Sequence, residues 1–266
     1  MELELTGKVA IVTGGSRGIG KAVARALARE GADVALIARD LVSAKATAEE
    51  IARASGRKIA AFSADTGDDA AVKKAVAQIV ADFKRIDILV NAAAQPGGQG
   101  RPPTLAEITN DHFWADMNVK VMGYLRCARE VAPYMTREGW GRIVNISGLA
   151  ARQTGSFIGT IRNVSVAALT KSLADELGPH GINVTCVHPG LTRTEKTAGV
   201  VQRQAEAAGV TPEEMERRMA ARNLIRRMVT ADEIADIVAF LASPKSIAIN
   251  GDAIAAGGGT PGAIYY

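Results

Sequence analysis

The chain has 266 residues, of which 47% are hydrophobic and 23% charged, a formal net charge of +4 and a mean hydropathy of +0.06. A chain of this size can bury one large core, and a membrane-spanning protein is excluded because no apolar run reaches the ~18 residues that a membrane helix needs. The aromatic fraction of 4% argues against a stacking surface for single-stranded nucleic acid, and the acidic start MELELTGK lacks the basic-then-apolar order of a secretory signal, so we expect a cytoplasmic protein.

Short apolar runs alternate along the chain with helical patterns. The predicted strands are 8–14, 33–38, 58–65, 86–94, 141–147, 182–190 and a closing strand within 248–259. The predicted helices are 20–32, 40–55, 68–84, 110–138, 156–178 and 231–243, with a Gly/Pro loop at 95–103. This alternation predicts an α/β fold with one doubly wound parallel sheet and helices on both faces. We expect a single domain over 1–266, in which the polar, helical segment 194–228 is a mobile flap over the ligand-binding edge.

The stretch TGGSRGIG, residues 13–20, lies between the first strand and the first helix. Gly14 permits the backbone turn, Gly18 lets the chain approach a pyrophosphate, and Gly20 allows close packing of helix and strand. The helix N-terminus adds unpaired N–H groups and a partial positive charge. The stretch therefore predicts a nucleotide site, and the alternative is a plain tight turn.

The order Gly-x-x-x-Gly-x-Gly, followed by NAAA at 91–94 and HPG at 188–190, resembles the short-chain dehydrogenase/reductase family. The resemblance extends from Leu5 to about Gly259. It implies a single Rossmann-type domain with a seven-stranded parallel sheet, and an oxidoreductase that passes hydride to or from a nicotinamide dinucleotide. It also implies a homodimer or homotetramer that packs through the helices at 110–138 and 156–178.

The resemblance assigns roles to single residues. It implies that Asp65 contacts the adenine, that Asn91 and Ala92 form the turn beside the adenosine ribose, and that Asn118 is the active-site asparagine. The alternatives are a helix cap for Asp65 and a surface position for Asn118. Together, the glycine turn and the resemblance predict a cofactor site of Gly14, Ser16, Arg17, Gly18, Ile19, Gly20, Arg39, Asp65, Thr66, Asn91, Ala92, Ala93, Asn163, Pro189, Gly190 and Thr192.

The second strand ends at Ala38-Arg39-Asp40, where a carboxylate would bind the ribose hydroxyls and repel a 2′-phosphate. The resemblance places Ala38 at the tip. Arg39 and Arg17 then flank the ribose, and two guanidinium groups favour a phosphate through charge-assisted hydrogen bonds. We therefore predict NADP, and Asp40 leaves NAD open if the strand register slips.

The proton-transferring residues of the family are absent from their usual positions. The family carries Tyr-x-x-x-Lys at the start of the helix after the fifth strand, and the match of AALTKSLADELG places that pair on Gly159 and Asn163. Ser147 stands in the first of two commonly hydroxylated positions and Gly148 in the second. The predicted catalytic set is Asn118, Ser147, Arg162 and Asn163.

Other residues are weaker sources of the proton. Thr160 is a very weak acid, and Arg162 polarises a carbonyl but stays protonated. His188 has a suitable pKa range, but a buried structural imidazole is the more ordinary interpretation. Further tyrosines are Tyr124 and Tyr134 in a helix, as core or interface residues, and Tyr265 and Tyr266 in the tail.

These observations leave three hypotheses. The first is an atypical NADP(H)-dependent oxidoreductase of a carbonyl, an alcohol or an activated alkene. The others are a non-catalytic NADP(H)-binding subunit and a lyase or isomerase that uses the cofactor structurally. The late cluster of Arg217, Arg218, Arg222, Arg226 and Arg227 is read first as a solvated helix face and second as a site for an anionic small-molecule substrate.

We expect no metal, membrane or nucleic-acid partner. The three histidines, His112, His180 and His188, show no ligand spacing. Cys127 and Cys186 lie far apart within apolar patterns, which predicts buried free thiols.

Overall fold

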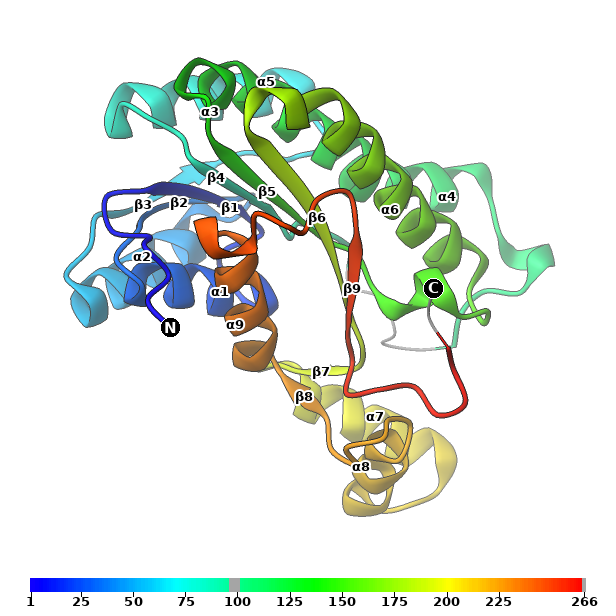
Figure 1. Ribbon diagram of the computed structural model, residues 1–266. Helices are drawn as coiled ribbons and strands as arrows, with labels where there is room; N and C mark the ends of the chain where they lie inside the picture. The colour runs from blue at the N-terminus through cyan, green and yellow to red at the C-terminus, as the bar shows by residue number, and fades with distance from the viewer. Residues whose placement is uncertain (96–100, 265–266) are drawn as a thin grey trace.

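Seven parallel strands form the central sheet of the computed structural model, which describes residues 1–95 and 101–264 (Figure 1). The strands are β1 (Val9–Thr13), β2 (Asp33–Ala38), β3 (Ile59–Ser63), β4 (Ile88–Asn91), β5 (Gly141–Ile146), β6 (Ile182–Pro189) and β9 (Ala253–Ala256). Their order is β3-β2-β1-β4-β5-β6-β9. The chain winds outward from β1 in one direction and then from β4 in the other, which opens a crevice at their carboxyl ends. The predicted doubly wound sheet is confirmed.

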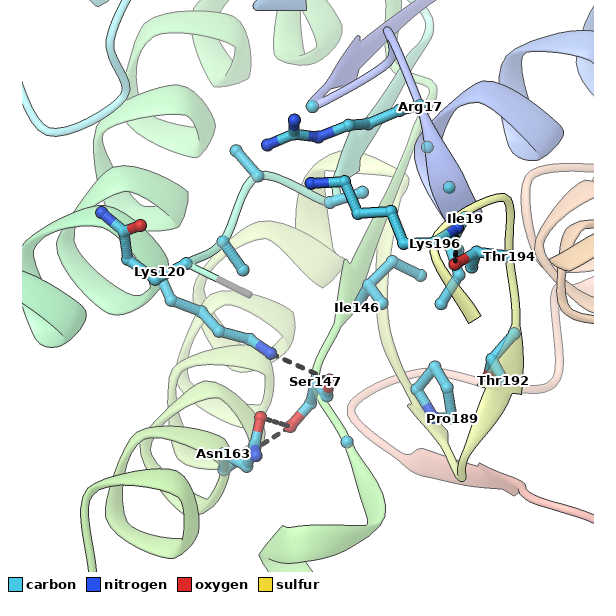
Figure 2. Close-up of a pocket in the computed structure, with 18 of the residues that line it drawn as sticks. Arg17, Ile19, Lys120, Ile146, Ser147, Asn163, Pro189, Thr192, Thr194 and Lys196 are labelled. Atoms are coloured by element: carbon cyan, nitrogen blue, oxygen red, sulfur yellow. Dashed lines mark hydrogen bonds between the residues drawn. The ribbon is translucent and has the colours of Figure 1, made fainter. Parts of the chain in front are cut away.

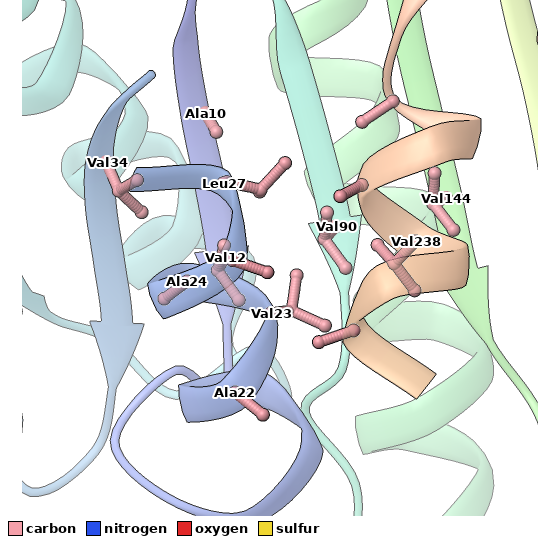
Figure 3. Packing of buried hydrophobic residues seen from close by; sticks show 14 of the residues in the cluster. Ala10, Val12, Ala22, Val23, Ala24, Leu27, Val34, Val90, Val144 and Val238 are labelled. Atoms are coloured by element: carbon pink, nitrogen blue, oxygen red, sulfur yellow. The ribbon is translucent and has the colours of Figure 1, made fainter. Parts of the chain in front are cut away.

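Helices cover both faces of the sheet, three on each (Figure 1). One face carries α1 (Gly18–Arg29), α2 (Leu41–Ser55) and α9 (Ala231–Leu241), and the other carries α3 (Asp69–Phe83), α5 (Gly123–Glu138) and α6 (Phe157–Leu177). Successive strand residues point to opposite faces, so Val12 packs under α1 while Ile11 packs on the other side. Figure 3 shows Val12, Val23, Leu27 and Val90 interlocked in the first of these cores. Cys127 and Cys186 are buried free thiols, as expected.

The predicted helix at 110–138 is instead three segments. It begins as α4 (Asn110–Met117), widens into the π-helical segment η2 (Asn118–Met122) and continues as α5. Such π-turns interrupt the i to i−4 hydrogen bonds and are frequent at functional sites. Here the widened turn carries Lys120, which is buried, 5% exposed.

The segment predicted as a flap contains two helices, α7 (Thr197–Ala208) and α8 (Pro212–Ala220). The short strands β7 (Thr192–Arg193) and β8 (Val229–Thr230) pair at its base. Its own small core consists of Val201, Ala205, Met215, Met219 and Met228. Figure 1 shows the pair of helices beyond the carboxyl edge of the sheet, and its mobility stays a prediction.

The remaining short helices of the described residues are η1 (Leu105–Glu107), η3 (Leu149–Arg152), η4 (Gly178–His180) and η5 (Pro244–Ser246). No helix in the described ranges is long and apolar enough to span a membrane. Those ranges also hold no group of three or more His, Cys, Asp or Glu side chains placed to bind a metal ion.

Candidate active site

A cleft of about 920 Å³ opens at the carboxyl edge of the sheet. The glycine turn before α1 forms one end of the cleft, and the start of α6 forms the other. Residues of the α7–α8 segment, among them Thr194, Val200 and Met219, form a further wall. The cleft therefore lies where the topology predicts a ligand.

Each glycine of the turn has a geometric reason. Gly14 and Gly18 adopt φ angles of +68° and +56°, a region that other residues rarely adopt. A Cβ on Gly20 would lie 2.3 Å from the Gly14 carbonyl oxygen, so no side chain fits there. A Cβ on Gly18 would meet only Thr194 at 3.8 Å, so this position is open for a ligand to approach.

Glu195, a residue that was not predicted from the sequence, contacts this turn from a distant loop. The Glu195 carboxylate accepts a hydrogen bond from the Gly18 amide, with N···O distances of 3.0 and 3.2 Å to its two oxygens. The amide belongs to the N-terminus of α1, where the helix dipole favours an anion. Glu195 thus occupies, with a carboxylate, the place that the turn offers to a phosphate.

Three cations surround the same end of the cleft. Arg17, Arg39 and Lys196 are exposed and line it, and neither arginine forms an ion pair with the described part of the chain. Figure 2 labels both Lys196 and Arg17 among the lining residues, and this lysine was not predicted from the sequence. The tip of β2 is Ala38, and Asp40 caps α2 by accepting from the amides of Val42 and Ser43 at 3.1 and 3.3 Å. Asp40 would select NAD only if the end of β2 were shifted by a residue or two, and the structure shows no such shift.

Most of the remaining predicted cofactor residues line the cleft, and these are Ser16, Ile19, Asp65, Thr66, Ala92, Ala93, Pro189, Gly190 and Thr192. Asp65 accepts a hydrogen bond from the Gly67 amide at 2.8 Å. Asn91 does not line the cleft: it is fully buried, and its amide donates to Asn145 Oδ1 at 2.9 Å. It braces β4 against β5, and a contact of Asn91 with the cofactor stays a prediction.

Ser147 and Asn163 are joined at the other end of the cleft (Figure 2). The Ser147 hydroxyl donates to the Asn163 carbonyl oxygen at 2.9 Å, and Asn163 Oδ1 lies 3.3 Å away. The Asn163 amide nitrogen in turn donates to the Gly159 carbonyl at 2.8 Å. A Cβ on Gly159 would lie 2.8 Å from Ser156 Oγ, which caps α6. The start of α6 is therefore a closed polar network with no acid in it.

Asn118 is not among the residues that line the cleft. Its amide nitrogen donates to the Gly67 carbonyl at 3.0 Å, and its Oδ1 accepts from Arg126 at 2.8 Å. Residues two positions apart on a helix point to nearly opposite sides, so Lys120 faces the cleft where Asn118 faces away. The Asn118 side chain thus bonds away from the cleft, and its role as an active-site group stays a prediction.

Lys120 is the functional candidate that the sequence analysis missed. Its Nζ donates to the Ser147 carbonyl oxygen at 2.9 Å (Figure 2). Burial lowers the pKa of Lys120 to about 7, and the positive charge of Arg162 contributes in the same direction. The signal in the sequence was a lone lysine within the apolar run VKVM, directly after Asn118.

The other proposed proton donors are engaged elsewhere. Arg162 lines the cleft but forms an ion pair with Asp116. His188 is 1% exposed, and burial lowers its pKa to about 4, so it is neutral at pH 7 and cannot supply a proton. Thr160 Oγ1 donates to the Gln153 carbonyl at 3.0 Å.

The tyrosines have separate positions. Tyr124 lines the cleft, but its hydroxyl donates to the Ile146 carbonyl at 2.9 Å, and burial raises its pKa above the usual range. Tyr134 packs against the core beneath α5. Tyr265 and Tyr266 lie outside the described residues.

The arginine cluster divides into two parts. Arg217 and Arg218 pair with Glu214, and Arg227 pairs with Glu233, all at the surface. Arg222 is exposed and lines the cleft. Only Arg217 and Arg218 lie on a helix, α8, whereas Arg222, Arg226 and Arg227 follow it, and Arg222 alone of the five borders the cleft.

Comparison with known proteins gives a consistent family. A family model described as enoyl-(acyl carrier protein) reductase matches residues 14–260. The short-chain reductase protein NovJ of Streptomyces niveus is 36% identical over 95% of this chain and 94% of its own length. The 3-oxoacyl-[acyl-carrier-protein] reductase FabG of Aquifex aeolicus is 32% identical over 97% of this chain and 99% of its own.

A solved structure shares the fold over almost its whole length. L-sorbose reductase from Gluconobacter frateurii, in complex with NADPH and L-sorbose, superposes with a TM-score of 0.91 at 27% identity. The match covers 99% of this chain and 100% of that one.

Proposed function

The chain belongs to the short-chain dehydrogenase/reductase family of oxidoreductases, and from that premise we propose that it is an atypical, NADP(H)-dependent reductase of a small carbonyl compound. The observation that carries the proposal is that one cleft joins the glycine turn, with Arg17 and Arg39 beside it, to the polar network at Ser147. Residues suited to the cofactor are present at one end, while the alignment that the resemblance implies places a glycine, Gly159, where the family carries its tyrosine.

The residues present fit the cofactor. The Gly18 position, where a Cβ would meet only Thr194, and the amide groups of α1 suit a diphosphate once Glu195 has left the Gly18 amide. Arg17 and Arg39 suit a 2′-phosphate, because β2 ends at Ala38 without a carboxylate to repel it. Bound NADPH supplies a hydride to the substrate carbon. Ser147 and Arg162, at the other end of the same cleft, would orient the substrate oxygen there.

A second function is favoured by one observation. With Gly159 and Asn163, the cleft-lining start of α6 carries neither a tyrosine nor a lysine, which suits a subunit that binds NADP(H) without turnover. The two functions predict the same binding and different chemistry.

Cofactor selection is tested by Arg39→Asp. This change places a carboxylate at the ribose, so we expect NADPH affinity to fall by about 10- to 100-fold, since a charge-assisted hydrogen bond is worth roughly 1.5–3 kcal/mol. NADH affinity is expected to hold or rise. Both are measured by calorimetric titration, with Arg53→Asp as the control because Arg53 is an exposed arginine of α2 that does not line the cleft.

Equal loss of both cofactors in Arg39→Asp would contradict the assignment of the 2′-phosphate to Arg39. Turnover is tested separately, by NADPH oxidation against a panel of ketones, aldehydes and α,β-unsaturated carbonyl compounds. Tight NADPH binding with no oxidation across the panel would favour the binding subunit.

A further inference from the structure

We infer that Lys120 is the proton donor of this enzyme, and that it supplies from η2 the proton that α6 cannot. The inference rests on the proposed reductase function. It assigns the acid to η2 instead of the family position at Gly159 on α6.

The geometry brings Lys120 to the reacting end of the cleft. Its side chain lines the cleft, and its Nζ donates to the Ser147 carbonyl at 2.9 Å (Figure 2). The Ser147 hydroxyl contacts Asn163 at 2.9 Å. Ser147 therefore contacts both the Lys120 ammonium group of η2 and the asparagine that stands at the family's lysine position on α6.

The ammonium group has no direct ion-pair partner among the described residues, although the Asp116 carboxylate acts on it at longer range. The residue is 5% exposed, and no carboxylate of the described residues forms an ion pair with it. A buried lysine is expensive to keep charged, and one carbonyl acceptor satisfies only one of its three N–H donors. Two N–H donors of Lys120 are therefore left for a ligand in the cleft.

The charged and titratable groups near Lys120 act on its pKa in both directions: Arg162 lowers it, while Asp116 and Cys186 raise it. These groups are Arg162 of α6, Asp116 of α4, Tyr124 of α5, and Cys186 and His188 of β6. Asp116 is paired with Arg162, burial keeps the Cys186 thiol and the Tyr124 phenol protonated, and His188 is neutral. Burial and the nearby Arg162 lower the pKa of Lys120 to about 7, which is close to the best value for an acid working at neutral pH.

The proton step balances in the reductive direction. The substrate carbon accepts a hydride and its electron pair, and NADPH is oxidised to NADP⁺. One N–H bond of the Lys120 ammonium breaks and an O–H bond forms on the substrate oxygen. The neutral amine then takes a proton from water.

The first test needs no substrate. Protein carrying ¹³C at the lysine Cε position is titrated by NMR, and we expect one lysine resonance to titrate near pH 7 and to be missing in Lys120→Met. Lys74→Met is the control, because Lys74 is exposed on α3 and its loss should leave that resonance in place. If every lysine resonance titrates above about pH 9, close to the ordinary lysine value, the inference is overturned.

The second test is kinetic. In the reductive direction kcat should fall as the pH rises through about 7, because the neutral amine has no proton to give. We expect Lys120→Met to lower kcat by about 10²- to 10⁴-fold and to abolish this inflection. Lys120→Arg should stay slow, because arginine keeps the charge but does not release its proton.

Three results would overturn Lys120 as the proton donor. If Lys120→Arg restores kcat, the residue acts through its charge and is a positioning residue, which overturns the inference. If the inflection moves in Tyr124→Phe but not in Lys120→Met, the donor is Tyr124 instead. If the wild-type enzyme is active and Lys120→Met is equally active, Lys120 is not the donor but the proposed reductase function stands. If the wild-type enzyme oxidises no NADPH across the panel, the proposed reductase function is overturned as well.

Discussion

At the scale of one residue, Arg222 differs from the other late arginines because it borders the cleft. Of the five late arginines, Arg217, Arg218 and Arg227 have carboxylate partners at the surface, and such exposed pairs contribute little to stability. Arg222 instead borders the cleft, opposite the start of α6. We propose that it selects substrates with an anionic group.

Arg222→Ala should therefore raise KM for a carboxylated ketone by about 10-fold, which corresponds to roughly 1.4 kcal/mol. The KM of the methyl ester of the same ketone should not change, because that compound lacks the charge. Arg218→Ala is the matched control. A KM increase that is equal for acid and ester would refute a role for charge, and steady-state kinetics with both compounds make the comparison.

The binding of a diphosphate depends, at the scale of an element, on the loop between β7 and α7. This loop places Glu195 on the Gly18 amide, so the opening of α1 already holds an anion. A diphosphate must displace that carboxylate and would be repelled by it. The loop also carries Lys196 toward the same space, where the opposite charge attracts phosphate (Figure 2).

Glu195→Gln should consequently tighten NADPH binding, by about 10-fold if the charge contributes roughly 1.4 kcal/mol. The glutamine can still accept from Gly18, so the helix keeps a cap while the repulsion is removed. Glu206→Gln, an exposed acid of α7 away from the cleft, controls for net charge. Unchanged or weaker binding in fluorescence titration would mean that Glu195 moves away without cost.

At the scale of the whole molecule, an exposed apolar stripe on α6 bears on the oligomeric state. Phe157, Ile161 and Val164 recur at helical spacing on α6 and are 52%, 44% and 47% exposed. An exposed apolar face of this kind is typical of an interface. It agrees with the expectation of a dimer or tetramer that packs through this helix, which we propose here.

Ile161→Lys should then shift the protein to a smaller species at micromolar concentration, because the lysine would have to be buried without a partner. Sedimentation velocity measures the change. Val42→Lys is the control, since Val42 is a lone exposed valine of α2. A wild-type protein that sediments as a monomer, or a variant that sediments like the wild type, would contradict the interface.

The sequence determined the strands, the sheet and the nucleotide-binding end, because these depend on local patterns. Apolar periodicity defines the helices and strands, and the glycines at 14, 18 and 20 are required by the backbone itself. The absence of tyrosine and lysine from the start of α6 was also visible, as Gly159 and Asn163.

Only the tertiary structure decided which side chains face the cleft. In the widened turn of η2, Lys120 faces the cleft and Asn118 does not, and no periodic pattern in the sequence predicts this turn. Long-range contacts, Glu195 on Gly18 and Lys120 on Ser147, join residues 177 and 27 positions apart. Side-chain direction and distant pairing arise from packing rather than from local preference, which is why they appear only in the folded chain.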